Sequence, residues 1–318
     1  MLPSIDIIIV NWNSGKQLSD CLQSIGDTVK TSFQLSRVIV VDNASSDNSV
    51  DGLQKFGFPL TIIRNKINLG FAAACNKGAK SSKADYLLFL NPDTMLFEHS
   101  LSVPIEFMER IENQQIGIVG IQLLDKDGNI SRTCARFPTL GAFFAKMFGL
   151  DRLFPNIFHS HFMTEWEHKD NRAVDQVMGA FFLVRRSLFE ALNGFDEGFF
   201  VYFEDVDFSL RARQLGWKSF FLADAQAYHK GGGTSEQVKA KRLFYSLRSK
   251  ILYGYKHFSW TSATLLMLGT LILEPLSRMV LSLSRWSGRE IIEICKAYLM
   301  LWGYTPELMK VAIKKWKY

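Results

Sequence analysis

Short apolar runs alternate with polar stretches through the first hundred residues of the chain. Four of these runs are rich in branched side chains and predict strands: IDIIIV (5–10), RVIVVD (37–42), LTIIR (60–64) and DYLLFL (85–90). The polar stretches between them predict helices: 16–22, 46–56 and 71–80. Strands that are apolar throughout and alternate with helices are typical of a mostly parallel sheet covered on both faces. The pattern therefore predicts an α/β fold.

Asparagine or aspartate follows every predicted strand. The positions are Asn11-Trp12-Asn13, Asp42-Asn43, Asn65 to Phe71, and Asn91-Pro92-Asp93. Any one of them is typical of a helix cap or a turn. In a parallel sheet, however, ligands bind beyond the carboxyl ends of the strands. There, amides and carboxylates could read a nucleobase and ribose hydroxyls, and one carboxylate could hold a divalent cation beside a diphosphate.

Several other classes of site lack their motifs in this sequence. No Gly-x-Gly-x-x-Gly follows the first strand, and no phosphate-cradling loop ends in Lys-Ser or Lys-Thr, which argues against dinucleotide-binding and P-loop folds. The four cysteines are far apart and match no metal-ligand or redox spacing, as expected in a reducing cytosol. The N-terminus lacks a basic region before its apolar run and indicates a first strand rather than a signal peptide.

A second acidic group lies at 203–217, FEDVDFSLRARQLGW. Glu204, Asp205 and Asp207 suit the start of a helix, where the dipole favours acids, and Asp207 can pair with Arg211 four residues on. The functional alternative is that one carboxylate is a general base that accepts the proton of an attacking hydroxyl. His229 follows another short strand, and a lone histidine is more often structural. We expect three further histidines to be surface residues: His159, His161 and His168.

The C-terminal part of the chain is basic and apolar. Residues 230–318 carry 15 lysines and arginines against 5 glutamates, whereas the chain as a whole has a net charge of +6. Such a region suits nucleic acid or an anionic membrane. Because no nucleic-acid-binding motif is present, the sequence favours a membrane surface.

Two segments of this part indicate how it would meet a membrane. Residues 236–256 predict a basic amphipathic helix, which suits either a membrane surface or packing on the sheet. Its apolar positions are Leu243, Phe244, Leu247, Ile251 and Tyr255. The uncharged run 259–273 is short for a span, and extending it to Leu283 would bury Glu274 and Arg278 in lipid. We therefore expect a hairpin or an interfacial helix, with the terminal KKWKY as a headgroup anchor.

Four segments, in this order, resemble the nucleotide-sugar-binding half of family 2 glycosyltransferases, which have the GT-A fold: IIIVNWNSGKQLSDCLQSI, VDNASSDNS, NLGFAAACNKGA and LFLNPDT. The likeness is greatest to bacterial rhamnosyltransferases that build O-antigen-type polysaccharides, and it covers about residues 4–255. The resemblance implies a nucleotide-sugar site formed by eleven residues: Val10, Asn11, Trp12, Asp42, Asn43, Asn68, Gly70, Phe71, Asn76, Asn91 and Asp93.

The resemblance also assigns the chemistry. Asn91-Pro92-Asp93 occupies the place of the family's Asp-x-Asp metal motif, with Asn91 in place of the first carboxylate, and His229 would complete a Mg²⁺ or Mn²⁺ site with Asp93. Asp205 corresponds to the family's catalytic base, with Glu204 as its neighbour. Family members work by an inverting mechanism in which the acceptor hydroxyl displaces the nucleoside diphosphate in one step.

These implications lead to a specific expectation of domains and function. Residues 1–235 would form a GT-A catalytic domain with a nucleotide-sugar half (1–125), an acceptor half (173–235) and an apolar connecting flap (136–171), and 236–318 a membrane-associating helical extension. The flap contains seven phenylalanines and could equally be core. The enzyme would transfer L-rhamnose from dTDP-L-rhamnose to a polyprenyl-diphosphate-linked saccharide at the cytoplasmic face of the bacterial inner membrane.

Three alternatives stay open at the level of sequence. The donor sugar could be galactofuranose, mannose or an N-acetylhexosamine. A nucleotidyltransferase can share a similar α/β sheet and metal carboxylate, although VNWNSGKQ is a poor match to its Gly-rich loop. A non-catalytic, membrane-tethered sugar-nucleotide binder would not need both Asp93 and Asp205.

Overall fold

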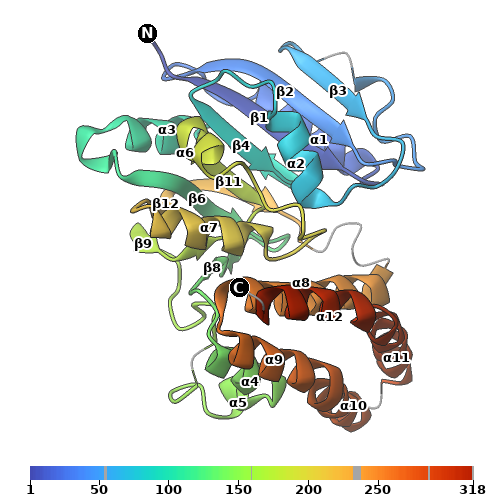
Figure 1. Ribbon diagram of the computed structural model, residues 1–318. Helices are drawn as coiled ribbons and strands as arrows, with labels where there is room; N and C mark the ends of the chain where they lie inside the picture. Colours follow the sequence, from blue (N-terminus) through green and yellow to red (C-terminus); the bar gives the residue numbers. More distant parts are fainter. Residues whose placement is uncertain (54–55, 159, 232–237, 286, 317–318) are drawn as a thin grey trace. The chain divides into compact units, whose positions relative to one another are not determined.

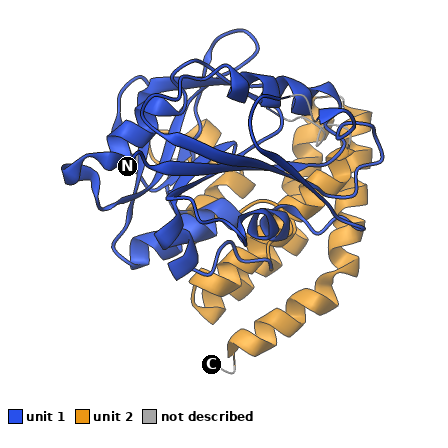
Figure 2. Cartoon of the chain, turned by 90° about the horizontal axis from the view of Figure 1, so that it is seen from above, with its two compact units in different colours: residues 1–137, 162–197, 204–234 blue, residues 138–161, 198–203, 235–318 orange. Residues whose placement is uncertain are grey.

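The computed structural model (Figure 1) describes residues 1–53, 56–158, 160–231, 238–285 and 287–316. The chain divides into two compact units, which Figure 2 distinguishes by colour. Unit 1 comprises residues 1–137, 162–197 and 204–234, and unit 2 comprises 138–161, 198–203 and 235–318. Most of the expected flap therefore belongs to the same unit as the C-terminal helices.

Unit 1 is built around a mixed sheet with the strand order β3-β2-β1-β4-β11-β6-β12-β5 (Figure 1). The bounds are β1 Ser4–Asn11, β2 Gln34–Asp42, β3 Leu60–Arg64, β4 Tyr86–Leu90, β5 Thr94–Leu96, β6 Ile116–Leu124, β11 Phe181–Arg185 and β12 Lys218–His229. Strands β3, β2, β1 and β4 are parallel, as the sequence predicts. Strand β11 is antiparallel to both β4 and β6, and β12 is parallel to β6.

Short strands extend this framework. Strand β7 (Ile130–Ser131) pairs with β6, and β9 (Arg172–Val174) pairs with β12. Strands β8 (Cys134–Ala135) and β10 (Gln176–Val177) form a separate two-stranded ribbon. The ribbon matters for the site because Gln176 lies in it.

Helices cover both faces of the sheet, so that unit 1 has three layers. The helices are α1 Lys16–Gly26, α2 Phe71–Ala79, α3 Ser102–Glu109, the 3₁₀ turn η2 Ile111–Asn113, α6 Arg186–Ala191 and α7 Glu204–Gln214. Alternate residues of β1 point to opposite faces. Ile7 packs in one core cluster with Leu18 and Leu22 of α1, whereas Ile8 packs in the other with Cys75 of α2. This leaves the carboxyl ends of the strands as the place for a site.

Unit 2 consists of helices around a smaller core. They are α4 Leu140–Met147, α5 Leu150–Leu153, α8 Lys239–His257, α9 Trp260–Leu268, the π-helical η4 Gly269–Leu273, α10 Glu274–Ser284, α11 Gly288–Gly303 and α12 Thr305–Trp316. The predicted amphipathic helix is α8, and its apolar side chains Leu247, Ile251 and Tyr255 are buried against residues of α9, α11 and α12. The apolar face of this helix therefore packs on other helices of unit 2 and not on the sheet.

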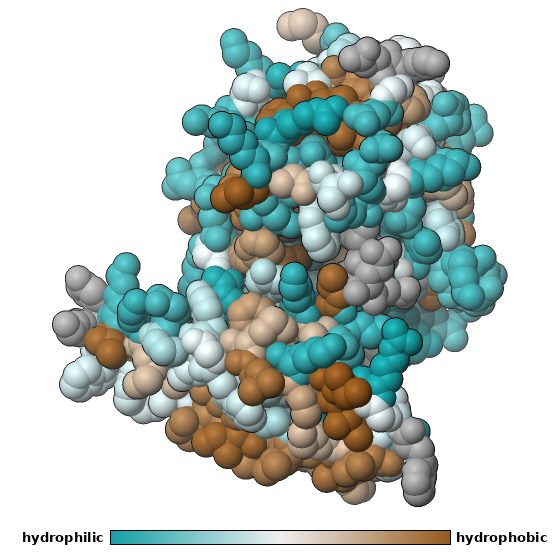
Figure 3. Space-filling model, turned by 90° about the vertical axis from the view of Figure 1, so that its right-hand side faces the viewer, coloured by the Kyte–Doolittle hydropathy of each residue, from teal (hydrophilic) through white to brown (hydrophobic). Residues whose placement is uncertain are grey.

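Apolar side chains also gather on the outside of unit 2. The described residues contain one helical stretch, Trp260–Ser284, that is long and apolar enough to cross a membrane. In Figure 3 the lower edge of the molecule is predominantly apolar, and this is the level at which α5 and α10 lie in Figure 1. The apolar surface of this part of the chain thus belongs to helices other than α8.

The prediction of a helix over residues 46–56 is wrong. Its described residues 46–53 run through turns and bends and contain no α-helix. Polar side chains bind the backbone here: Asn13 Oδ1 accepts hydrogen bonds from the backbone N–H groups of Ser46 (2.6 Å) and Asp47 (3.3 Å). Asp47 Oδ1 in turn accepts from the N–H of Ser49 (3.2 Å). Such local bonds offer the backbone an alternative to the helical ladder.

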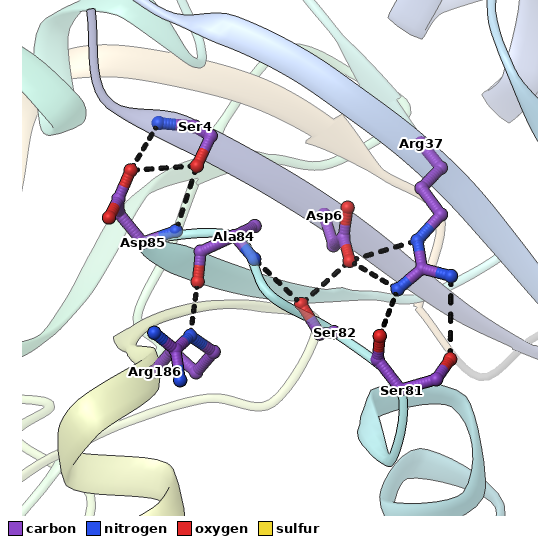
Figure 4. Close-up of polar contacts among 8 residues, drawn as sticks. All are labelled: Ser4, Asp6, Arg37, Ser81, Ser82, Ala84, Asp85 and Arg186. Carbon is purple, nitrogen blue, oxygen red and sulfur yellow. Dashed lines mark hydrogen bonds and ion pairs between the residues drawn. The ribbon is translucent and has the colours of Figure 1, made fainter. Parts of the chain in front are cut away.

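A carboxylate, Asp6, interrupts the apolar run of β1, and Figure 4 shows how it is accommodated. Asp6 Oδ2 accepts hydrogen bonds from Arg37 Nε (3.2 Å) and Nη2 (3.0 Å) and from Ser82 Oγ (2.6 Å). Nearby, Asp85 Oδ2 accepts from the backbone N–H of Ser4 (2.8 Å). A buried charge is tolerated when it is paired in this way. These contacts lie at the amino ends of β1 and β4, away from the strand ends that form the site.

Candidate functional site

The last residues of β1 and β2 are joined through a buried amide. Asn11 is fully buried, and its Nδ2 lies 2.9 Å from Asp42 Oδ1, 3.0 Å from Ser45 Oγ and 2.9 Å from Ser49 Oγ. Asn11 therefore orients the Asp42 carboxylate at the strand end. Val10, which is buried, and Trp12, which is half-buried, flank this amide along the chain. The structure thus brings together the residues predicted to line the base pocket.

Asn43 fixes the loop that precedes α2. Its Nδ2 donates to the carbonyl oxygen of Gly70 (3.0 Å), and its Oδ1 accepts from the N–H of Leu69 (3.1 Å). Asn68 Oδ1 accepts from the N–H of Gly70 (2.9 Å), which has φ +86° and directly precedes Phe71. Glycine adopts this backbone conformation without the steric cost that a side chain brings. Three more predicted residues, Asn68, Gly70 and Phe71, therefore lie beside the end of β2.

Asn76 is placed differently from the other predicted nucleotide-sugar residues. Its Nδ2 donates to the carbonyl oxygen of Phe195 (2.8 Å) and to Glu197 Oε1 (3.0 Å), and its Oδ1 accepts from the N–H of Phe195 (2.9 Å). Both ends of the amide are engaged by the segment that follows α6. In this structure Asn76 therefore links that segment to α2 by hydrogen bonds.

The two predicted metal ligands lie in direct contact. Asp93 Oδ1 is 3.3 Å from His229 Nε2, and both side chains are only about one-tenth exposed. The register of two strands causes this proximity, since Thr94 of β5 pairs with His229 of β12. Carboxylate and imidazole are suitable donors for Mn²⁺, and oxygen ligands for Mg²⁺. The described residues contain no cluster of three or more His, Cys, Asp or Glu side chains placed to hold a metal ion, so Asp93 and His229 stand as a pair.

The predicted base, Asp205, is held by donors on both carboxylate oxygens. Oδ2 accepts hydrogen bonds from the N–H of Gly179 (3.0 Å) and from Gln176 Nε2 (2.9 Å), and Oδ1 accepts from the N–H of Val206 (2.8 Å). Burial raises the pKa of Asp205, and these hydrogen bonds offset only part of that effect. A carboxylate with a raised pKa that is only partly buried is a better proton acceptor than an ordinary aspartate.

Glu204 occupies a different environment from its neighbour. It is 6% exposed, and its Oε2 has no hydrogen-bond partner among the described residues. Burial, followed by the charge of Asp205, raises the pKa of Glu204 well above its ordinary value. Three donors favour negative charge on Asp205. The charged form is therefore disfavoured more strongly at Glu204 than at Asp205.

Two consecutive residues link this base to the predicted metal motif. Gly179 donates to Asp205, and the carbonyl oxygen of Ala180 accepts from the N–H of Asn91 (3.0 Å) and from Thr94 Oγ1 (3.4 Å). The segment that enters β11 thus connects Asp205 to the loop that carries Asp93. The sequence interpretation did not assign Gln176, Gly179 or Ala180 to the site, and the nearest available signal was a glycine placed directly before an apolar strand.

Two other predictions about charged side chains have clear outcomes. Asp207 is fully buried and pairs with Arg211 Nε at 2.8 Å, which confirms the expected pair along the helix. His168, expected on the surface, is fully buried: it stacks on Trp166, and its Nε2 accepts from the N–H of Cys134 (3.1 Å). That expectation was wrong because ring stacking and backbone hydrogen bonds satisfy the imidazole in the core. His161 is half-buried, and His159 lies outside the described residues.

Known proteins similar to this chain are glycosyltransferases. A family model described as Glycosyl transferase family 2 matches residues 6–193. The N-acetylglucosaminyl-diphospho-decaprenol L-rhamnosyltransferase of Mycobacterium tuberculosis is 25% identical over 280 residues, which cover 83% of this chain and 89% of that protein. The rhamnosyltransferase WbbL of Escherichia coli is 27% identical over 172 residues, covering 53% and 61%.

Solved structures provide an independent comparison of the fold. The mannosyltransferase PcManGT from Pyrobaculum calidifontis, in complex with GDP-Man and Mn²⁺, is similar with a TM-score of 0.56 and 13% sequence identity. The match covers 95% of this chain and 87% of that chain. The curled, mixed α/β sheet resembles GT-A glycosyltransferases, which confirms the predicted fold class.

Proposed function

This chain belongs to glycosyl transferase family 2, and from that premise we propose that it transfers L-rhamnose from dTDP-L-rhamnose to a polyprenyl-diphosphate-linked saccharide. Family membership removes the nucleotidyltransferase alternative. The relatives from M. tuberculosis and E. coli, both named as rhamnosyltransferases, support the choice of sugar. The decaprenol diphosphate in the first name supports a lipid-linked acceptor. The same chemistry applies with galactofuranose, mannose or an N-acetylhexosamine as donor sugar.

The observation that carries the proposal is the arrangement of Asp205 relative to the Asp93 loop. Gly179 binds the carboxylate of Asp205, while Ala180 binds the backbone of Asn91, two residues before Asp93. In this proposal Gly179 positions the base that serves the acceptor, and the adjacent Ala180 positions the loop that binds the diphosphate of the donor. Transfer between two substrates requires both groups close to one another.

The proposed reaction is a single displacement. Asp205 accepts the proton of the acceptor hydroxyl as its oxygen forms a bond to the anomeric carbon of the donor sugar. The bond from that carbon to the diphosphate oxygen breaks, its electron pair leaves with the nucleoside diphosphate, and the configuration at the anomeric carbon inverts. Burial disfavours a negative charge on Glu204, the neighbour of Asp205. A positioned base of this kind typically contributes about 10²–10⁴-fold in rate.

Binding of the donor would use the edge formed by β1, β2 and the loop before α2. We assign Asp42 to the base, the segment from Asn68 to Phe71 to the ribose and diphosphate, and Asp93 with His229 to a divalent cation. The Mn²⁺ in the mannosyltransferase complex supports a cation in this fold. When bound, Mg²⁺ or Mn²⁺ would neutralise charge on the departing diphosphate.

We further propose that the protein works at the cytoplasmic face of the bacterial inner membrane, as a peripheral or monotopic protein. A polyprenyl-diphosphate-linked acceptor is confined to the bilayer, so its transferase must reach the membrane surface. The excess of lysine and arginine in residues 230–318 supports attraction to anionic lipid.

Release of nucleoside diphosphate by the purified full chain tests the proposal. The protein is incubated with dTDP-L-rhamnose, GDP-mannose, UDP-galactofuranose or UDP-N-acetylglucosamine, each with and without a polyprenyl-diphosphate-linked saccharide. The mass of the glycolipid product is measured by mass spectrometry. We expect release and a mass increase of one deoxyhexose only when dTDP-L-rhamnose and acceptor are both present. A product with another sugar would replace the donor assignment, and turnover by the Asp205→Asn variant at the rate of the wild type would contradict the assignment of Asp205 as the base.

A further inference from the structure

Helix 260–284 of unit 2 carries an apolar stripe that faces away from the core of that unit. It comprises α9, η4 and α10 without interruption. The exposed members of the stripe are spaced three or four residues apart, and each is more than two-fifths exposed: Leu265, Leu268, Ile272, Leu276, Val280 and Leu283. This spacing places them on one face of a helix.

The opposite face of the same helix carries its two charged residues, of which Glu274 is buried and Arg278 is partly exposed. Between Trp260 and Ser284 the charged residues are Glu274 and Arg278. Glu274 is 5% exposed and forms an ion pair with Lys250 of α8, and Arg278 Nη2 lies 2.9 Å from Glu274 Oε1. Lys250 is itself buried. The carboxylate near the middle of the helix is therefore tied to a neighbouring helix rather than available to lipid.

This arrangement separates two ways of meeting a bilayer. At 1.5 Å per residue the helix is long enough to cross a hydrocarbon core of about 30 Å. Crossing would carry Glu274 into hydrocarbon and separate it from Lys250, and a charge at the centre of a membrane helix is unfavourable. If the helix lies in the interface between lipid tails and headgroups, the ion pair of Glu274 with Lys250 is kept and only the apolar stripe is immersed in lipid.

The α4–α5 segment adds to the same surface. Helix α4 packs closely on η4, since a Cβ at Gly269 would lie 2.8 Å from Phe144 Cε1. Directly after α4, large apolar side chains are exposed: Phe148, Leu153, Phe154 and Ile157. The apolar lower edge in Figure 3 corresponds to the level of α4, α5, α9 and α10 in Figure 1. The apolar area is thus wider than one helix.

Tryptophan and lysine side chains lie at one end of the stripe. Trp260 Nε1 donates to the carbonyl oxygen of Ala312 in α12 (3.1 Å), and its ring centre is 6.2 Å from that of Trp316. Lys314 and Lys315 are exposed beside Trp316. Tryptophan and lysine favour the boundary between lipid tails and headgroups. A second copy of this chain would bring the same excess of positive charge, whereas anionic lipid brings the opposite charge.

We propose that unit 2 is a monotopic anchor that lies in one leaflet of an anionic bilayer without crossing it. The stripe of helix 260–284 and the exposed apolar side chains that follow α4 are immersed, and Glu274 faces the protein. This inference deepens the proposed function, because it gives the catalytic unit a fixed attachment to the membrane that holds a lipid-linked acceptor.

Flotation with sealed vesicles of equal parts phosphatidylcholine and phosphatidylglycerol tests attachment of the full chain. We expect the wild type to float with the vesicles, and the double variant Leu276→Asp/Val280→Asp to lose at least about tenfold in partitioning, because both side chains would bring charge into apolar surroundings. The control is Ile111→Asp, an exposed isoleucine of unit 1, which should float like the wild type. Equal flotation of all three proteins, or a wild type that self-associates and ignores vesicles, would overturn the proposal.

Labelling of the helix ends distinguishes lying from crossing. Ser259→Cys and Ser284→Cys are exposed positions flanking the stripe, and each variant is bound to the outside of sealed vesicles. A membrane-impermeant maleimide should label both, and protection of one end until detergent is added would show that the helix crosses. Calorimetry with dTDP-L-rhamnose separates this inference from the proposed function: vesicle binding without donor binding would contradict only the function. Donor binding without vesicle binding would contradict the anchor and the proposed membrane location, and would leave the assignment as a glycosyltransferase in place.

Discussion

Gln176 donates a hydrogen bond of 2.9 Å from Nε2 to Oδ2 of Asp205, the carboxylate assigned as the catalytic base. Gln176 is 5% exposed and also donates to the carbonyl oxygen of Val177 (2.6 Å), so its amide is fixed in one orientation. A buried amide of this kind fixes the position of the carboxylate and stabilises its charged form. Gln176 is therefore a positioning residue that acts through Asp205.

Replacement of Gln176 by leucine should raise the pKa of Asp205, because one donor to the charged form is lost. A hydrogen bond to a charged group contributes about 1.5–3 kcal/mol, and since Asp205 keeps two other donors we expect a shift at the lower end, roughly one pH unit. The acidic limb of the pH profile of kcat/KM should move to higher pH by that amount. The measurement is nucleoside diphosphate release across the acidic and neutral range.

Gln122 provides the matched control for this variant. It is also a buried glutamine, and its Nε2 donates to the carbonyl oxygen of His168 (2.6 Å) instead of to the base. Gln122→Leu should lose stability and leave the pH profile in place. An unmoved acidic limb in Gln176→Leu, or an equal movement in both variants, would contradict the positioning role.

The strand ends were predictable because they follow from local patterns. Four apolar runs predict four strands, and the carboxyl ends of parallel strands share one edge, which brings Asn11, Asp42 and Asn43 together. Asp93 and His229 lie far apart in the sequence, and only the resemblance to family 2 glycosyltransferases implied that they are in contact. In the structure it arises from the pairing of β5 with β12.

Other features of the chain could not be predicted because they depend on tertiary packing. Gln176 and Asp205 are joined through a two-stranded ribbon and the first turn of α7, and neither leaves a periodic signal in the sequence. The apolar face of α8 is evident from its spacing, but spacing does not reveal whether protein or lipid covers it. The burial of His168 likewise depends on Trp166 and a backbone donor from β8.

Two aspartates on α7 should respond differently to the same substitution. Asp205→Asn should lower turnover by about 10²–10⁴-fold with little change in donor affinity, because the lost carboxylate serves the acceptor. Asp207→Asn should instead lower the free energy of unfolding by about 3 kcal/mol, since Arg211 would lose its buried partner. Turnover assays, donor calorimetry and urea unfolding on both variants check this. Loss of donor binding in Asp205→Asn would place that residue in the donor site.

Glu204→Gln should stabilise the protein progressively as the pH rises. Because burial raises the folded pKa of Glu204, its contribution to stability is complete below the unfolded pKa and is lost as the pH rises through the folded value. The loss is at most about 1.4 kcal/mol for each pH unit within this window. Glutamine does not ionise and so does not lose stability in this way. The difference in free energy of unfolding between variant and wild type should therefore grow from acidic to neutral pH. A constant difference in urea unfolding across that range would show that Glu204 is not protonated in the fold.

Removal of either predicted metal ligand should weaken cation-dependent donor binding. Asp93→Ala and His229→Ala each leave one protein ligand, and a single carboxylate or imidazole holds a divalent ion loosely. Calorimetry with dTDP-L-rhamnose, with Mn²⁺ and then with chelator, should show a metal-dependent increase in affinity for the wild type and little for either variant. His99, a histidine outside the site, serves as the control through His99→Ala. Binding and turnover that ignore chelator would mean that the site holds no metal.

The buried ion pair of unit 2 should matter more to stability than a surface pair of the same unit. The side chains of Lys250 and Glu274 are 10% and 6% exposed, whereas those of Lys310 and Glu307, 2.7 Å apart, are 71% and 51% exposed. Glu274→Gln leaves a buried lysine without its charged partner and should lower the free energy of unfolding by about 3 kcal/mol. Glu307→Gln should change it by less than about 1 kcal/mol. Urea unfolding in mild detergent compares the two, and equal losses would mean that Glu274 does not hold helix 260–284 to α8 as the anchor requires.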